Sequence, residues 1–253
     1  MRTLRRNNRT SFVSFSGIDG AGKSTQIEAL CARLKKDGLE VRLIRFWDDI
    51  ARFARFREAT GHSIFKGDKG VGTPSAPINR RDKNVRSRSI TGVRLFLYFA
   101  DAISVRIAVE KALRTEADLV IFDRYIHDEL ANLTLRNPAI RVYVRLIMKL
   151  VPKPHISFLL DADPVKARAR KPEYPLEFLY TNRESYLALS DLVGGMTIIA
   201  PMSIHEVKRA VLGHALRVLS FRAPQRENGG TAPSDKSSEP AKLDRPQSRA
   251  AAS

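Results

Sequence analysis

The sequence predicts an α/β protein in which a parallel β-sheet is flanked by helices in three layers. Three observations lead to this fold class. Short apolar stretches alternate with longer amphipathic ones along the chain. One short stretch, residues 12–15, runs directly into a glycine-rich loop and then into a helical pattern. Another, residues 119–122, has four apolar residues in a row, which is typical of a parallel strand buried on both faces.

The glycine-rich loop has the spacing of a phosphate-binding loop, Gly17-x-x-x-x-Gly22-Lys23-Ser24. Its glycines let several backbone N–H groups point at phosphate oxygens, and the following helix directs its positive end at the same anion. Lys23 would contact the β- and γ-phosphates of a nucleotide, and the Ser24 hydroxyl would hold Mg²⁺. The alternative is a glycine-rich turn with an incidental lysine. We predict a nucleotide triphosphate site made of Gly17, Ile18, Asp19, Gly20, Ala21, Gly22, Lys23, Ser24 and Thr25.

The other elements alternate as an α/β fold requires. The apolar residues Ile27, Leu30, Cys31 and Leu34 share one face of the helix that follows the loop. From residue 91 to 108, apolar residues cover most of the helical circumference, so we expect a central, well-buried helix. The remaining predicted strands are 39–46, 156–160 and 196–200, and the remaining predicted helices are 23–36, 140–151, 176–191 and 203–219.

Three segments are expected to lie outside this regular pattern. Residues 1–10 form a basic arm, and residues 222–253 have too few large apolar residues to order themselves, which leaves 11–221 as the folded domain. Residues 61–92 read as a long loop that is either functional or disordered.

Charge and composition narrow the class of protein. The chain has 253 residues and a net charge of +17, and residues 42–94 carry thirteen basic and five acidic residues. A surplus of positive charge favours the binding of polyanions, which include nucleotides, nucleic acid and anionic lipid. A solvated basic face explains the surplus equally well. We find no membrane span and no secretory signal, and Cys31 is the only cysteine, so we expect a cytoplasmic protein.

Five segments taken together resemble the thymidylate kinase family of nucleoside monophosphate kinases. They are GIDGAGKSTQ (17–26), LFLYFADA (95–102), LVIFDRYIHDELAN (119–132), FLLDADP (158–164) and ESYLAL (184–189). The resemblance implies a P-loop NTPase fold with a lid at about 165–175. It also implies ATP-dependent, Mg²⁺-assisted transfer of a phosphoryl group to a nucleoside monophosphate, dTMP to dTDP. The implied partner is a small nucleotide acceptor. The resemblance also suggests a homodimer through the helix near 95–107, and the alternative is that this apolar helix lies in the interior of one chain.

The same resemblance assigns roles to individual residues. Arg124 would bind the acceptor phosphate or form a structural ion pair, and Asp123 would hold the metal with Ser24 or cap the next turn. Asp19 would contact the acceptor sugar or stabilise its loop. Some family members carry a catalytic arginine at the position of Gly20, so the lid residues Arg168 and Arg170 become candidates, unless they form a solvated helix face. The predicted catalytic residues are Lys23, Arg124, Arg168 and Arg170.

The acceptor side departs from the family pattern. Arg45, Phe46 and Tyr98 are the matching candidates, but Ala102 stands where the family has a base-reading arginine. This departure leaves open an alternative that keeps the fold and phosphorylates a different acceptor, such as a nucleoside or a sugar phosphate. A second alternative rests on charge alone. It is a nucleotide-gated binding module whose basic segment 42–94 contacts nucleic acid or a membrane surface.

Overall fold

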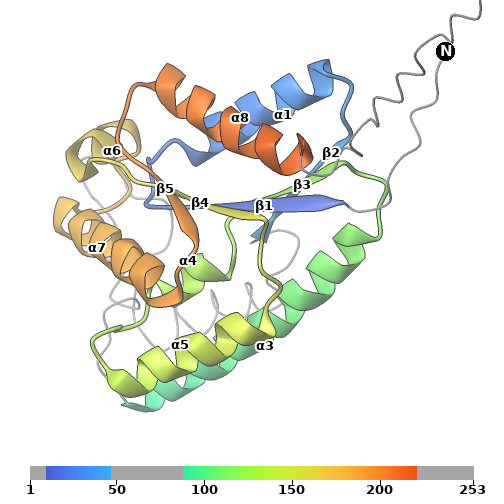
Figure 1. Ribbon diagram of the computed structural model, residues 1–253. Helices are drawn as coiled ribbons and strands as arrows, with labels where there is room; N and C mark the ends of the chain where they lie inside the picture. The colour runs from blue at the N-terminus through green and yellow to red at the C-terminus, as the bar shows by residue number, and fades with distance from the viewer. Residues whose placement is uncertain (1–9, 47–87, 221–253) are drawn as a thin grey trace, which may run out of the picture. The chain divides into compact units, whose positions relative to one another are not determined.

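The computed structural model describes residues 10–46 and 88–220. Five strands form one sheet in which every neighbouring pair is parallel, in the order β2-β3-β1-β4-β5 (Figure 1). The predicted parallel sheet is confirmed. The strands are β1 Ser11–Ser16, β2 Val41–Arg45, β3 Leu119–Asp123, β4 Ile156–Leu160 and β5 Met196–Ile199.

Seven described helices accompany the sheet, and most begin and end within a few residues of the predicted bounds. α1 spans Lys23–Lys36, as expected from its apolar face. Two short helices, α4 and α6, were not predicted. The helices after α1 are α3 Arg88–Leu113, α4 Ile126–Leu130, α5 Pro138–Leu150, α6 Pro164–Arg170, α7 Leu176–Val193 and α8 Ile204–Ser220.

The strands separate two apolar cores because successive side chains point to opposite faces. Phe12 and Phe122 belong to the core shared with α3, α4, α5 and α7, whereas Val13 and Ile121 belong to the core shared with α1 and α8. Figure 1 shows α1 and α8 together on one face of the sheet and α3 and α5 on the other. The fold therefore has the three layers that the sequence predicts.

The carboxyl ends of the strands meet at one edge of the sheet. Asp123, the last residue of β3, lies level with Arg45 of β2 and with Phe15 of β1. The phosphate-binding loop leaves this same edge after Ser16 and leads into α1. Open α/β sheets bind their ligands at this edge, so the topology gathers the candidate site residues there.

The prediction that the helix from residue 91 is central and well buried is wrong for one of its faces. The inner face of α3 is buried, with Ala102, Val105 and Val109 in the core. Its opposite face exposes Val93, Phe96, Phe99, Ile103 and Ile107, each by 40% or more. The all-round apolar character of α3 therefore reflects one face packed on the domain and one apolar face at the surface.

Several predictions fall outside the described residues. They are the basic arm (1–9), the segment between β2 and α3 (47–87, including most of the long loop and of the basic run) and the tail (221–253). In residues 10–46 and 88–220, no helix combines the length and apolarity needed to cross a bilayer.

Candidate active site

Lys23 lies at the centre of the phosphate-binding loop. It is the first residue of α1, its side chain is buried, and its ammonium group donates to the carbonyl oxygens of Gly17 (2.6 Å) and Ile18 (3.0 Å). The pKa of Lys23 is lowered to about 8, mainly by burial and then by the charge of Arg124, against the opposing charge of Asp19. A buried ammonium group held against the loop is suited to binding phosphate oxygens.

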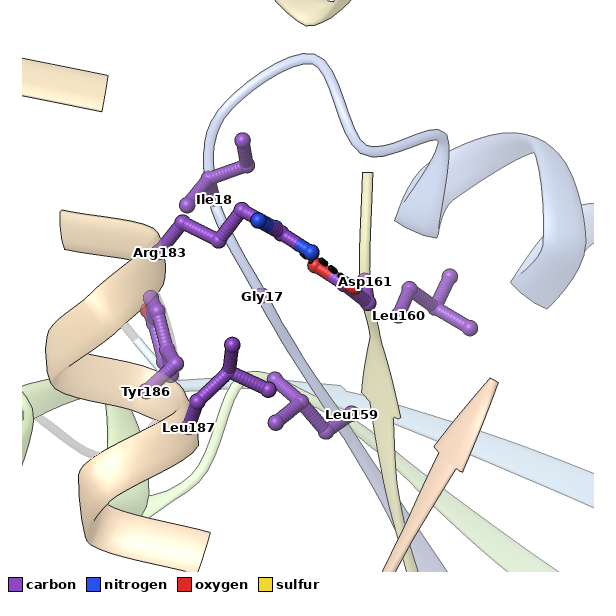
Figure 2. A pocket seen from close by; sticks show the side chains of 8 residues that line it. All are labelled: Gly17, Ile18, Leu159, Leu160, Asp161, Arg183, Tyr186 and Leu187. Atoms are coloured by element: carbon purple, nitrogen blue, oxygen red, sulfur yellow. Dashed lines mark hydrogen bonds and ion pairs between the residues drawn. The ribbon is translucent and has the colours of Figure 1, made fainter. Parts of the chain in front are cut away.

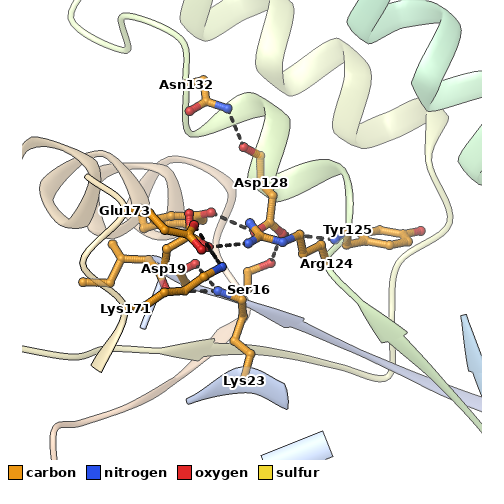
Figure 3. Close-up of polar contacts among 12 residues, drawn as sticks. Ser16, Asp19, Lys23, Arg124, Tyr125, Asp128, Asn132, Lys171 and Glu173 are labelled. Atoms are coloured by element: carbon orange, nitrogen blue, oxygen red, sulfur yellow. Dashed lines mark hydrogen bonds and ion pairs between the residues drawn. The ribbon is translucent and has the colours of Figure 1, made fainter. Parts of the chain in front are cut away.

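Arg124 faces the loop from the end of β3. Its Nη2 donates to Asp19 Oδ1 at 2.6 Å, which joins the two segments (Figure 3). Burial of Asp19 alone would raise its pKa, but the charges of Arg124, Lys23 and Lys171 outweigh burial and hold the pKa well below its ordinary value. The Asp19 carboxylate therefore links the loop that carries Lys23 to Arg124, the candidate for binding the second phosphate.

A second carboxylate, Asp128, contacts Arg124 from the other side. Arg124 Nη1 donates to Asp128 Oδ1 at 3.5 Å, and Asp128 also accepts hydrogen bonds from the Ser16 hydroxyl (2.7 Å) and the Tyr186 hydroxyl (2.8 Å). Burial of Tyr186, followed by the charge of Asp128, raises the pKa of its phenol well above the ordinary value, so the hydroxyl keeps its proton. Burial acts to lower the pKa of Arg124, but the carboxylates of Asp19 and Asp128 raise it overall.

The backbone of Arg124 is in the left-handed region, with φ of 70°. Among the described residues it is the only non-glycine with a positive φ, a conformation that costs about 1–2 kcal/mol. Its N–H donates to the Phe15 carbonyl oxygen at 3.0 Å, which fixes the turn to the end of β1. Strain of this kind persists where surrounding contacts hold it, and it is common at functional sites.

The two metal-binding candidates lie on neighbouring segments of this edge. Ser24 is in the first turn of α1 and is exposed, and Asp123 ends β3 and is half-buried. Burial raises the pKa of Asp123, while the charges of Arg124 and Lys23 act to lower it. A hydroxyl and a carboxylate are oxygen ligands of the kind that Mg²⁺ prefers, so the donor set fits this ion.

The predicted lid segment contains α6 and lies against the phosphate-binding loop. Arg170 Nη1 would be 3.9 Å from a Cβ atom placed on Gly22, so its guanidinium reaches the loop. Lys171 Nζ lies 3.9 Å from Asp19 Oδ1 and 3.2 Å from Glu173 Oε2 (Figure 3). Arg168 is half-buried on the same helix. These placements put two cations of the lid segment, Arg170 and Lys171, beside the loop.

The acceptor-side candidates are more dispersed. Arg45 is exposed at the carboxyl end of β2, level with Asp123, whereas Phe46 and Tyr98 are buried in the core. Ala102, one helical turn after Tyr98, is fully buried. Phe46 and Tyr98 thus belong to the same apolar core as Tyr125 and Tyr186.

A small pocket opens beside the loop between β4 and α7. Figure 2 shows it lined by Gly17, Ile18 and Leu187, among others, with Arg183 and Asp161 joined across it. Arg183 donates to both carboxylate oxygens of Asp161, at 2.6 and 2.7 Å. This two-bond pair ties α7 to the end of β4, immediately before the lid segment.

Sequence reasoning missed Asp128, Tyr186 and the Asp161–Arg183 pair. The spacing Tyr125-x-x-Asp128 carries a signal, since an acid three residues after a helix N-cap can accept from the N-cap amide. Tyr186 carries no local signal, because it is 58 residues from Asp128 in the chain.

The chain is similar to several known proteins that carry the same name. The chain is 32% identical to a probable thymidylate kinase of Pyrobaculum aerophilum, covering 84% of this chain and 100% of that protein. It is 28% identical to a probable thymidylate kinase of Pyrobaculum calidifontis, covering 83% and 97%. It is 29% identical to a probable thymidylate kinase of Pyrococcus abyssi, covering 82% and 98%. No family model matches the chain.

Proposed function

The chain belongs to the thymidylate kinase family of nucleoside monophosphate kinases, and on this premise we propose that it transfers the γ-phosphoryl group of ATP to dTMP. The observation that carries the proposal is the contact between Arg124 and Asp19, at 2.6 Å. It places a guanidinium from β3 opposite the phosphate-binding loop. A kinase of this class needs two cationic anchors, one for each phosphate, facing each other across the transferred group.

The donor side is assigned to the loop. Backbone N–H groups from Gly17 to Thr25 and the Lys23 ammonium would bind the phosphates of ATP. Ser24 and Asp123 would hold Mg²⁺, which neutralises charge on the phosphate oxygens when it is bound. Lys23 already lies buried against the loop carbonyls, so it needs only to exchange those acceptors for phosphate oxygens.

The acceptor side is assigned to Arg124, with Asp19 and Arg45 beside it. The guanidinium fork binds a phosphate through two N–H groups, and its fixed geometry orients the group for in-line attack. Asp19 would accept a hydrogen bond from the acceptor sugar. On the lid, Arg170 is the better placed of the two predicted arginines, because its guanidinium reaches towards Gly22. It would stabilise the charge that develops during transfer.

dTMP is proposed as the acceptor because the relatives named above carry the name thymidylate kinase. The base-reading arginine of the family is replaced by Ala102, which lies in the core. A site without that donor discriminates less among bases. We therefore expect dTMP to be accepted with weaker preference over dUMP and dCMP than a base-reading arginine would provide.

A coupled assay of ADP release tests the proposal. The full chain is given ATP, Mg²⁺ and each deoxynucleoside and ribonucleoside monophosphate in turn. We expect ADP release that depends on dTMP and falls at least about 100-fold in Lys23→Ala, because the buried cation is lost. Lys36→Ala, which removes an exposed lysine from the other end of α1, is the matched control and should retain activity. If no monophosphate stimulated ADP release, the proposal would be wrong.

A further inference from the structure

Asp128 is a buried acid that no predicted role uses, and it is held by contacts from three directions. It is 3% exposed. Its Oδ2 accepts from the Ser16 hydroxyl at the end of β1 (2.7 Å), and its Oδ1 accepts from the Tyr186 hydroxyl of α7 (2.8 Å). These are neutral donors, so they fix the position of the carboxylate without cancelling its charge.

The same carboxylate also fixes the backbone next to Arg124. Its Oδ2 accepts from the Tyr125 N–H at 3.1 Å, and the Asp128 N–H donates to the Tyr125 carbonyl oxygen at 3.0 Å. Both backbone polar groups of Tyr125, the residue that follows the left-handed Arg124, are therefore paired with Asp128. This reciprocal pair stabilises a backbone conformation that a non-glycine residue rarely adopts.

The Asp128 carboxylate also contacts the side chain of Arg124. Nη1 faces Asp128 Oδ1 at 3.5 Å, while Nη2 is directed at Asp19 on the loop at 2.6 Å (Figure 3). Asp128 thus contacts one amino group of the guanidinium, and Asp19 on the loop contacts the other. This contact leaves the Nη2 edge directed towards the loop, where the acceptor phosphate would bind.

We propose that Asp128 is a positioning residue that holds the Arg124 guanidinium and its strained turn in the geometry that binds the acceptor phosphate. This inference rests on the proposed function, because it assumes that Arg124 binds an acceptor phosphate. Asp128 itself touches no reacting atom. Because Asp128 contacts Arg124 directly, we expect its effect on acceptor binding to exceed its effect on ATP binding.

Steady-state kinetics of the full chain with dTMP and ATP tests this inference. Asp128→Asn keeps the shape of the side chain and removes its charge, so we expect the KM for dTMP to rise about tenfold or more. The KM for ATP should change less than about twofold. Asp118→Asn is the matched control, since Asp118 accepts from the Glu40 N–H at 2.8 Å at the opposite end of β3. An unchanged KM for dTMP in Asp128→Asn would overturn the inference.

A double-substitution cycle separates positioning from a merely structural role. If Asp128 acts through Arg124, Asp128→Asn should add less than about threefold to the KM for dTMP in an Arg124→Lys background. If the double substitution raised the KM for dTMP by the product of the two single effects, the inference would be overturned. If Asp128→Asn does not fold, Tyr186→Phe removes one donor to Oδ1 and should raise the KM for dTMP about two- to fivefold; no rise would count against the inference.

Failure of the proposed function would be recognised separately. It would appear as a wild-type chain that phosphorylates no monophosphate. The melting temperatures of the four proteins in the cycle would then still test the contact. A melting-temperature shift in the double variant that is smaller than the sum of the two single shifts would support coupling of Asp128 and Arg124. A shift equal to that sum would overturn it.

Discussion

At the scale of single residues, the buried His127 should make the stability of the protein depend on pH. It follows Ile126 in α4, is 1% exposed, and its ring lies 5.6 Å from that of Tyr125. Its pKa is lowered from 6.5 to about 4, because burial disfavours the charged imidazole more than the charge of Asp128 favours it. In the folded protein the imidazole is therefore neutral at pH 7.

The sign of the effect on stability follows from linkage. Between pH 6.5 and about 4 the unfolded chain binds a proton at His127 that the folded chain does not. The free energy of unfolding should therefore fall as the pH drops through this window, by as much as ~3 kcal/mol. Urea unfolding from pH 4 to 8 measures it. His127→Gln should flatten the acid limb relative to His205→Gln, which removes an exposed imidazole from α8; identical limbs in both variants would contradict the prediction.

The sequence predicts the roles of some single residues and not of others. Lys23 was recognisable because the loop motif specifies its role through local spacing, and Asp123 and Arg124 because they end a buried strand. Asp128 could not be found in this way. Its importance depends on Ser16 and Tyr186, which are brought to it only by the folding of β1 and α7. Contacts between distant segments are not encoded in any local pattern.

At the scale of elements, the contact between α6 and the phosphate-binding loop explains Gly20. A Cβ atom on Gly20 would lie 2.2 Å from the Ala167 carbonyl oxygen, and φ at Gly20 is 80°. The backbone of α6 leaves no room for a side chain here, and the left-handed conformation disfavours one further. An arginine therefore cannot occupy this position while α6 lies against the loop.

This contact predicts a specific effect of Gly20→Ala. The new methyl group should push α6 away from the loop, and kcat for dTMP phosphorylation should fall at least tenfold. Gly38→Ala is the matched control, since Gly38 has φ of 81° and nothing within 4 Å of the added Cβ. That variant should lose about 1 kcal/mol of stability from backbone strain and keep its kcat. The same kcat in Gly20→Ala and wild type would refute the role of this contact.

The elements also divide into those that periodicity predicts and those that it does not. α1 and β4 match the predicted bounds, because a continuous apolar face or run specifies them. The short helices α4 and α6 were missed, since five and seven residues are too few to show a period. α6 nevertheless carries a start signal. Asp163 accepts from the Lys166 N–H at 3.0 Å, and Pro164 occupies the first helical position.

At the scale of the whole molecule, the outer face of α3 bears on assembly. Val93, Phe96, Phe99, Ile103 and Ile107 are all exposed, and Phe96 most of all at 68%. α5 packs beside α3 and adds two exposed apolar side chains, Val142 and Leu146. Groups of exposed apolar side chains of this kind mark interaction surfaces in soluble proteins. A helix of 26 residues is about 40 Å long, which is enough for a continuous interface.

We expect this face to form a homodimer, because a two-fold axis across α3 would bury the same apolar residues on both copies. Light scattering after size exclusion should give a mass about twice the 28.4 kDa of one chain. Phe96→Glu should return the mass to that of one chain, since two carboxylates would be buried near the axis without partners. Ile204→Glu, an equally drastic change at a 56% exposed residue of α8, should leave the dimer intact. A wild-type chain that stays monomeric at the concentrations used for kinetics would rule out this assembly, and the apolar face of α3 would then need another occupant.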